Sequence, residues 1–352
     1  MDISALYNQF PLQSMEKEIA QLFPEWNLKL YDLFQAVLQG NTLDFLKKTA
    51  IQILEQFAGE LSGIKGVLLT LILLGILSAV FHNLSGIFEH QHLAEYGYYY
   101  LYFIMILFLT KIYTVLYDDT KALLENVTLF IRMFLPTYFF TITAAGGSAT
   151  AVGYYQLFMA VVYVIETILY RIFLPGIAVY MLLNMVNGIW EEEKLTLFIA
   201  LIKKTIMTGL KVLLALVTGT GMIQSMITPV IDSAKMNVLQ KSVSAVPGFG
   251  DLAGSASQTL LACAVLIKNA TGIILFLLLI ILCAVPLGKL FFMMALFKIS
   301  AAVMGIVADK RMSNTVNHIG DGILMMFQTV LSAATLFVIL IAIVAFTANR
   351  GI

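Results

Sequence analysis

The residues that could do chemistry in this chain are ionisable side chains within segments that are otherwise apolar enough for lipid. An ionised group at the centre of a bilayer costs about 2.5–3.5 kcal/mol on insertion scales, so such residues are rare and tend to be functional. Glu166 is the clearest acid of this kind, and Lys268 with Asn269 interrupts a later apolar segment. The remaining members of the set are Lys111, Arg132, Arg171, Lys211 and Lys298.

A contact between Glu166 and Lys268 would bring two of these groups together. The pair could line a polar path, or it could simply hold two helices together. We favour the second role, because several of the lysines in this set could reach a membrane surface with their long side chains.

Two pairs of prolines in apolar sequence form a second set of candidates. Pro136 and Pro175 are 39 residues apart, as are Pro247 and Pro286, and the second pair follows the first by 111 residues. A proline within a helix frees backbone carbonyl groups. Lipid cannot satisfy these groups, so protein or a wet cavity must do so. Broken helices of this kind are typical of the binding sites of transporters.

Short stretches of small residues follow the first proline of each pair. They cover residues 144–150 and 253–257, and small residues allow helix backbones to approach closely. We expect a functional core where the two broken helices meet, near Pro175 and Pro286. Close packing without a pore or substrate site is an equally good alternative. The small residues concerned are Gly146, Gly147, Gly254 and Ser255.

Composition indicates the class of protein that must position these residues. The 352 residues are 60% hydrophobic and 12% charged, with a mean hydropathy of +0.91. Soluble domains are about 45–50% apolar and about 25% charged, so we expect an all-α membrane protein that crosses the bilayer several times. A net charge of zero gives no electrostatic basis for nucleic-acid binding. Residues 1–20 lack the pattern of a cleavable signal peptide.

The expected architecture has two parts. Residues 1–62 are polar, and their helical spacing predicts two or three short amphipathic helices that lie on the membrane or against a partner. Residues 63–350 form the transmembrane domain. Because a span needs roughly 20 apolar residues, we expect about seven or eight transmembrane helices there, the first two at 64–81 and 98–117. Tyrosines within 96–100 predict an aromatic belt at the lipid boundary.

Two charged segments, 118–135 and 228–246, separate some of these spans. Each carries apolar and polar side chains on opposite helix faces and ends at a proline, Pro136 or Pro247. Charges spaced around a helix make a crossing through lipid costly. We therefore expect amphipathic helices that do not cross the bilayer as isolated spans.

The repeated order of elements predicts an internal repeat with units of about 98–189 and 207–307. Each unit has a span, an amphipathic helix, small residues, a proline-broken apolar stretch and a charged turn. If each unit contributes three spans, the second unit must be inverted relative to the first, about an axis in the membrane plane. The alternative is that the proline spacings coincide by chance.

No pattern of catalytic or cofactor-binding residues is apparent, so we expect a protein that is not an enzyme and holds no cofactor or metal ion. The glycines in 248–254 have the wrong spacing for a dinucleotide loop. The histidines in 82–92 have no acidic constellation nearby, and His318 stands alone. Cys263 and Cys283 lie in apolar stretches, which is typical of small buried side chains.

Four pieces of sequence occur in a characteristic order. They are the apolar run at 69–74, Gly-Gly-Ser-Ala at 146–149, Leu-Ile-Lys-Asn-Ala-Thr-Gly-Ile at 266–273 and Ala-Val-Pro at 284–286. This order resembles the stage III sporulation protein AE family of endospore-forming bacteria, over essentially residues 40–350. Family members commonly begin with a signal sequence and a longer extracytoplasmic region. Because this chain starts in its amphipathic part, we expect a mature or trimmed form.

The resemblance implies a role that composition cannot show. Family members are similar to export-apparatus subunits of a channel between mother cell and forespore, in the mother-cell membrane around the forespore. They act with other stage III sporulation membrane proteins and, indirectly, with stage II sporulation protein Q, and they sustain late forespore gene expression through sigma factor G. The resemblance supplies no catalytic residue.

We therefore expect a permease-like or export-apparatus-like membrane subunit of this complex. Two alternatives stay open. One is a free-standing secondary transporter, which the inverted repeat would equally suggest. The other is a membrane scaffold that recruits partners through residues 1–62.

Overall fold

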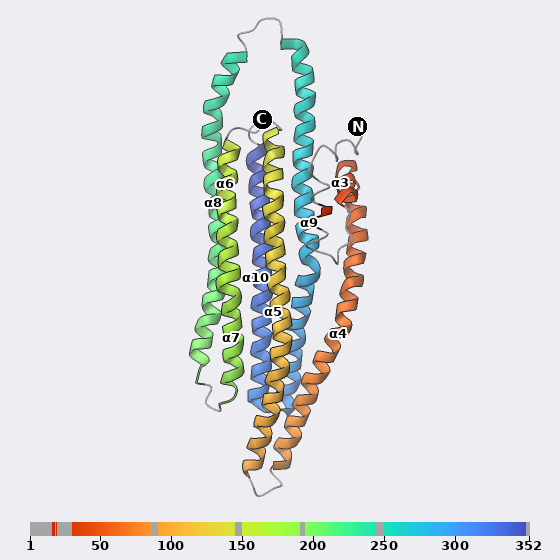
Figure 1. Cartoon of the computed structure of the whole chain (residues 1–352), viewed down its shortest axis with the longest axis vertical. Coiled ribbons are helices and arrows are strands. Elements are labelled where there is room, and N and C mark those ends of the chain that lie inside the picture. The colour runs from red at the N-terminus through yellow and green to blue at the C-terminus, as the bar shows by residue number, and fades with distance from the viewer. Residues whose placement is uncertain are drawn as a thin grey trace.

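The computed structural model describes residues 16, 17, 19, 30–85, 91–144, 150–190, 194–243 and 250–349. Side chains are described within these ranges except in 60–64, 81–95, 137–138, 140–155, 220–269, 307 and 344–349. The described residues form a bundle of long helices, which confirms the predicted all-α class (Figure 1). The helices are α3 (Leu30–Gln39), α4 (Thr42–Ser85), α5 (Gln91–Ala144), α6 (Thr150–Ile168), η1 (Leu169–Phe173), α7 (Leu174–Asn187), α8 (Thr196–Val243), α9 (Gly250–Val307) and α10 (Lys310–Asn349).

Within the described part, four helical segments are long and apolar enough to cross a membrane. One shorter apolar segment, Lys65–Val80, lies in α4. Four long segments and one short one in the described part do not confirm the expected seven or eight transmembrane helices. The four segments are Tyr96–Pro136, Gln156–Asn187, Ala270–Ile306 and Lys310–Ile343.

The helices are much longer than a bilayer requires. α5, α8 and α9 have 54, 48 and 58 residues, which corresponds to about 70–90 Å at 1.5 Å per residue. The hydrocarbon core of a bilayer is about 30 Å thick. Large parts of these helices must therefore lie outside any membrane that the bundle crosses.

α10 is the central helix of the bundle. It packs against α5, α7, α8 and α9 (Figure 1). Its apolar side chains are buried along most of the helix, whereas the helices around it expose large apolar side chains at many positions. Buried side chains of α10 include Val316, Ile319, Ile323, Met326, Val330 and Phe337.

Local sequence explains where α3 ends and α10 begins. Gly40 has a positive φ of 76°, which glycine adopts without a Cβ clash. The N–H groups of Gly40 and Asn41 donate to the carbonyls of Val37 and Ala36 and so close the end of α3. Asp309 accepts a hydrogen bond from the N–H of Arg311 at 2.8 Å and caps the start of α10.

The chain keeps a helical path at Pro175 through one π-helical turn. η1 precedes this proline, and the N–H of Leu174 donates to the carbonyl of Leu169, five residues earlier. In a regular α-helix a proline ring collides with the carbonyl four residues before it, and a wider turn relieves that conflict. The predicted break at Pro175 is therefore a local change of helix type.

Other helix boundaries predicted from the sequence are wrong as well. Pro136 and Pro286 lie inside α5 and α9, which continue past them. α5 and α8 also run without interruption through the charged segment 118–135 and through Thr228 to Val243, so these segments are not separate amphipathic helices. In 118–135 most apolar side chains are buried in the bundle, although Leu129 is exposed, and two charged side chains, Asp119 and Arg132, pair with residues on other helices. Pro247 lies outside the described residues.

The inverted repeat is not confirmed. The described part of each unit is a pair of long helices, α5 with α6–α7 and α8 with α9. In Figure 1, α5 and α8 run in one direction, and α6–α7 and α9 run in the other. An even number of helices per unit leaves the second pair in the same orientation as the first.

The predicted boundary at residue 62 falls within α4, which continues from the polar region into Lys65–Val80.

Glycines let side chains of neighbouring helices come close to α8 and α10. A Cβ at Gly209 of α8 would lie 2.5 Å from Cζ of Phe173 in η1. A Cβ at Gly322 of α10 would lie 2.5 Å from Cγ of Met181 in α7. Both separations are far below van der Waals contact, so these glycines fix how closely α7 and η1 approach their neighbours.

We expect Gly209→Ala to lower the free energy of unfolding by about 1–3 kcal/mol, because the Phe173 ring must shift to make room. Gly219→Ala is the matched control in the same helix, since nothing lies within 4 Å of its added Cβ. That change should be neutral or stabilising by up to about 1 kcal/mol. Thermal unfolding of the two purified variants in detergent measures the difference, and equal stability would contradict this packing.

Candidate functional site

Asp321 of α10 is the centre of an ion-pair network that joins three helices. Lys298 of α9 donates to Asp321 Oδ1 at 2.6 Å, and Lys203 of α8 donates to Oδ2 at 3.0 Å. The Asp321 side chain is 13% exposed, whereas those of Lys298 and Lys203 are 32% and 40% exposed. One carboxylate thus faces two ammonium groups, which leaves the network with a net positive charge.

Two neighbours of Asp321 on α10 extend this network. Lys298 also donates to the carbonyl of Asn317 at 3.1 Å and to its Oδ1 at 2.7 Å. His318 Nδ1 lies 3.7 Å from Asp321 Oδ2, so the view that His318 stands alone is wrong. Lys298 was among the predicted ionisable candidates, but Asp321 was missed. Its signal was the helical spacing of Asn317, His318 and Asp321 in an otherwise apolar segment.

A second polar layer ties together the start of α5, the end of α7 and the start of α10. Tyr98 donates to the carbonyl of Gly188 at 2.8 Å. Tyr102 donates to the carbonyl of Met185 at 2.7 Å and lies 2.9 Å from Thr315 Oγ1. A Cβ at Gly188 would overlap the Tyr102 hydroxyl. This layer leaves no room for a ligand and acts as a helix clamp.

The tyrosines predicted to form an aromatic belt divide into two groups. Tyr98 is buried and stacks on Tyr102, with the ring centroids 5.4 Å apart. The guanidinium carbon Cζ of Arg311 lies over the Tyr98 ring, 3.8 Å from the ring centroid. Tyr96 and Tyr100 are 72% and 69% exposed. Only the exposed tyrosines therefore have the placement that an interfacial belt needs.

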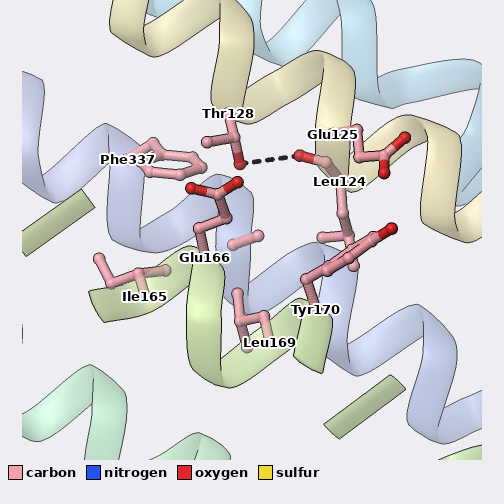
Figure 2. Close-up of a pocket in the computed structure, with 9 residues that line it drawn as sticks. Leu124, Glu125, Thr128, Ile165, Glu166, Leu169, Tyr170 and Phe337 are labelled. Carbon is pink, nitrogen blue, oxygen red and sulfur yellow. Dashed lines mark hydrogen bonds between the residues drawn. The ribbon is translucent and has the colours of Figure 1, made fainter. Parts of the chain in front are cut away.

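Glu166 lies on α6 and forms an ion pair with Arg132 of α5. Figure 2 shows its carboxylate beside Thr128, between α5 and Phe337 of α10. The cavity at this place has a volume of about 10 Å³, about what one water molecule needs. Glu166 therefore holds α6 against α5, as the helix-holding hypothesis expected, but its described partner is Arg132. The side chain of the expected partner, Lys268, lies outside the described residues.

The structure does not bring Pro175 and Pro286 together. Beside Pro175, a Cβ at Gly176 would contact Ile206 of α8, and near Pro286 a Cβ at Gly288 would contact Phe57 of α4. In Figure 1, α5 and α10 lie between α7 and α9. The described residues therefore do not form the predicted core at these prolines.

The remaining predicted site residues are only partly described. Gly146 and Gly147 lie outside the described residues. Four others lie on α9, and their side chains are not described; they are Gly254, Ser255, Lys268 and Asn269. Among the residues that the structure describes, no group of three or more His, Cys, Asp or Glu side chains could hold a metal ion.

Asp321→Asn should destabilise the bundle because it leaves Lys203 and Lys298 without a counter-charge. We expect a loss of about 1–3 kcal/mol, below the about 3–5 kcal/mol of a fully buried pair, since the lysines are partly exposed. Asp119→Asn, which breaks the pair of Asp119 with Lys289 at 3.0 Å, is the control, and it should cost at most about 1 kcal/mol.

Unfolding in a denaturing detergent, followed by circular dichroism, measures both variants. Adding Lys298→Met to Asp321→Asn should recover part of the loss, because one uncompensated charge is then removed. Equal stability of the Asp321→Asn and Asp119→Asn proteins would show that the network does not stabilise the bundle.

Comparison with known proteins identifies the family. The profile of the stage III sporulation protein AE family matches residues 28–348. Stage III sporulation protein AE of Bacillus subtilis (strain 168) is 20% identical over 281 residues, which cover 80% of this chain and 70% of that protein. No solved structure matches the chain. Since the family match extends over nearly all of the helical bundle described above, the chain belongs to the stage III sporulation protein AE family.

Proposed function

We propose that this protein is a permease-like or export-apparatus-like membrane subunit of the mother cell–forespore channel complex that endospore formation requires. Membership of a stage III sporulation family supports a role in sporulation. One structural observation carries the more specific proposal. Exposed apolar side chains are most frequent in one part of the bundle, over lengths close to the thickness of a bilayer, and the helices continue far beyond that part.

Five helices expose large apolar side chains most densely over similar short lengths. Outside these dense stretches, exposed apolar side chains also occur on α4, α5, α6 and α9: Leu43, Ile51, Leu54, Leu129, Leu157, Tyr163, Val164, Ile273, Phe276 and Ile280. Each dense stretch has about 12–20 residues and is about 18–30 Å long, which matches the hydrocarbon core of a bilayer. Residues at the ends of these stretches are Leu69 and Val80 in α4, Tyr96 and Val115 in α5, Ile172 and Trp190 around α7, Leu197 and Leu216 in α8, and Phe291 and Ile306 in α9.

Charged and aromatic residues mark both edges of these stretches. Asp309 and Arg311 pair at one edge, next to the buried Tyr98. At the other edge, Lys289 of α9 pairs with Asp119 of α5 at 3.0 Å. We call the part between these edges the membrane band. It comprises residues 65–85 of α4, 96–117 of α5, 170–190 of η1 and α7, 196–216 of α8, 287–307 of α9 and 310–331 of α10.

Beyond the membrane band the long continuations of the helices lie on one side. α9 has a further 37 residues there, 250–286, which is about 55 Å of helix. Figure 1 shows α8 and α9 reaching farther than the other helices on this side, which also carries α3. A projection of this length suits a subunit that contacts other proteins away from its membrane.

Neither described cavity favours a free-standing transporter. The cavity beside Glu166 is too small for a substrate. A polar opening of about 470 Å³ lies between α3 and the start of α4, outside the membrane band. We therefore rank the transporter below a complex subunit, and we infer that the protein has no catalytic activity of its own.

Native purification from sporulating cells tests this proposal. The tagged full-length chain should co-purify with other stage III sporulation membrane proteins and, indirectly, with stage II sporulation protein Q. Deleting its gene should reduce spore yield to near zero and abolish late forespore expression from a reporter that depends on sigma factor G. A multi-pass membrane protein of the same cells with the same tag is the control.

The outcomes separate the three candidate functions. A chain that purifies alone, from cells whose spore yield does not depend on it, contradicts the complex. A chain that purifies alone but catalyses substrate uptake in proteoliposomes supports the transporter. If the partners co-purify but late forespore expression stays intact after the gene is deleted, the result supports the scaffold.

A further inference from the structure

One face of α10 within the membrane band is polar and incompletely covered. Five residues, spaced three or four apart, share this face, and all five are partly exposed. The side chains on other faces of α10 at this level are mostly buried. We call these five residues the α10 face, and they are Asn314, Asn317, Asp321, Leu324 and Gln328.

The ion pairs of Asp321 place the α10 face between α8 and α9. Lys203 approaches from α8 and Lys298 from α9, one on each oxygen of the carboxylate. The side chains of Lys203 and His318 are 40% and 41% exposed. The network is therefore open on the side that faces away from the bundle.

Lipid is a poor neighbour for this face. Asp321 lies ten residues along α10 from Arg311 at the edge of the membrane band, which is about 15 Å and too deep for a lipid headgroup. Two turns farther on, Oε1 of Gln328 is buried without a hydrogen-bond partner in the described part of the chain. Lipid tails offer neither a counter-charge nor a hydrogen bond.

The charge of the membrane band indicates what covers the α10 face. Asp321 is the single acid in the sequence of the band, and five lysines lie away from its edges. A second copy of this chain therefore has no free carboxylate to offer at this depth, and two α10 faces in contact would set positive charge against positive charge. The lysines are Lys111, Lys203, Lys204, Lys211 and Lys298.

We propose that the α10 face binds a transmembrane helix of a different protein, and that this helix carries an Asp or Glu at the depth of Asp321. The partner is a helix because only a helix satisfies its own backbone in lipid as a single segment. Its carboxylate meets Lys203 and Lys298, which together exceed the charge of Asp321. The inference rests on the proposed function, whose complex supplies such a partner.

Site-specific photo-crosslinking in sporulating cells tests the proposal. A benzophenone amino acid replaces Leu324 on the α10 face in the full-length chain. Phe103 of α5, which is 54% exposed in the same band, is the matched control position. The Leu324 position should give an adduct with a membrane protein whose crosslinked helix contains Asp or Glu, identified by mass spectrometry, and the Phe103 position should not.

Charge exchange then tests the chemistry of the contact. Lys298→Gln should reduce the Leu324 adduct about tenfold or more, because a buried charge pair across the interface is lost. Lys298→Glu should abolish the Leu324 adduct. In cells with Lys298→Glu, replacing the partner's acid by Lys should restore the adduct. Lys111→Gln, at an exposed position of α5, should leave the adduct unchanged and controls for folding and protein level.

Four results would overturn the proposal. They are an adduct between two copies of this chain, an adduct with a helix that has no acid, crosslinking to lipid alone, and rapid labelling of a Leu324→Cys protein by a water-soluble maleimide. If stage III sporulation proteins co-purify without any Leu324 adduct, the docking site fails while the proposed function stands. If the acidic helix belongs to a protein outside that complex, the proposed function fails while the docking site stands.

Discussion

The sharing of one carboxylate by two lysines is the interaction on which the arrangement of this bundle depends. Lys203 and Lys298 stand on α8 and α9, and both pair with the carboxylate of Asp321. α10 must therefore lie between these two helices. In that position its remaining faces are covered by α5 and α7, which buries its apolar side chains and makes it the axis of the bundle.

The same constraint explains why helices with charged segments run on without a break. A charged side chain is costly in lipid but not where a neighbouring helix supplies the opposite charge. Arg132 has Glu166, and Asp119 has Lys289. These contacts let α5 carry charge while Val127 and Phe130 stay in the apolar core. Under the proposed function, long helices of this kind join a membrane-embedded part to a projecting part without a flexible link between them.

Sequence was sufficient for the class of fold and for a few of its local boundaries. Apolar stretches predicted the helices, and the charged turn at 309–311 marked the end of α9. The continuity of α5 was not predictable, because whether charges interrupt a span depends on partners that are distant in sequence. Pro175 and Pro286 looked equivalent in spacing, yet one needs a π-helical turn and the other lies within a long helix. Asp321 was missed because its lysines lie on other helices, 118 and 23 residues away.

The central claim is that the membrane surrounds the level of Asp321 and that the helices project from it on one side. Electron cryomicroscopy of the full-length protein in lipid nanodiscs tests this directly, since the lipid belt is visible around the helices. The account predicts a belt around residues 96–117 of α5 and 196–216 of α8, with residues 250–286 of α9 outside it. A belt around residues 118–144 of α5 and 150–168 of α6, with Asp321 in solvent, would contradict it.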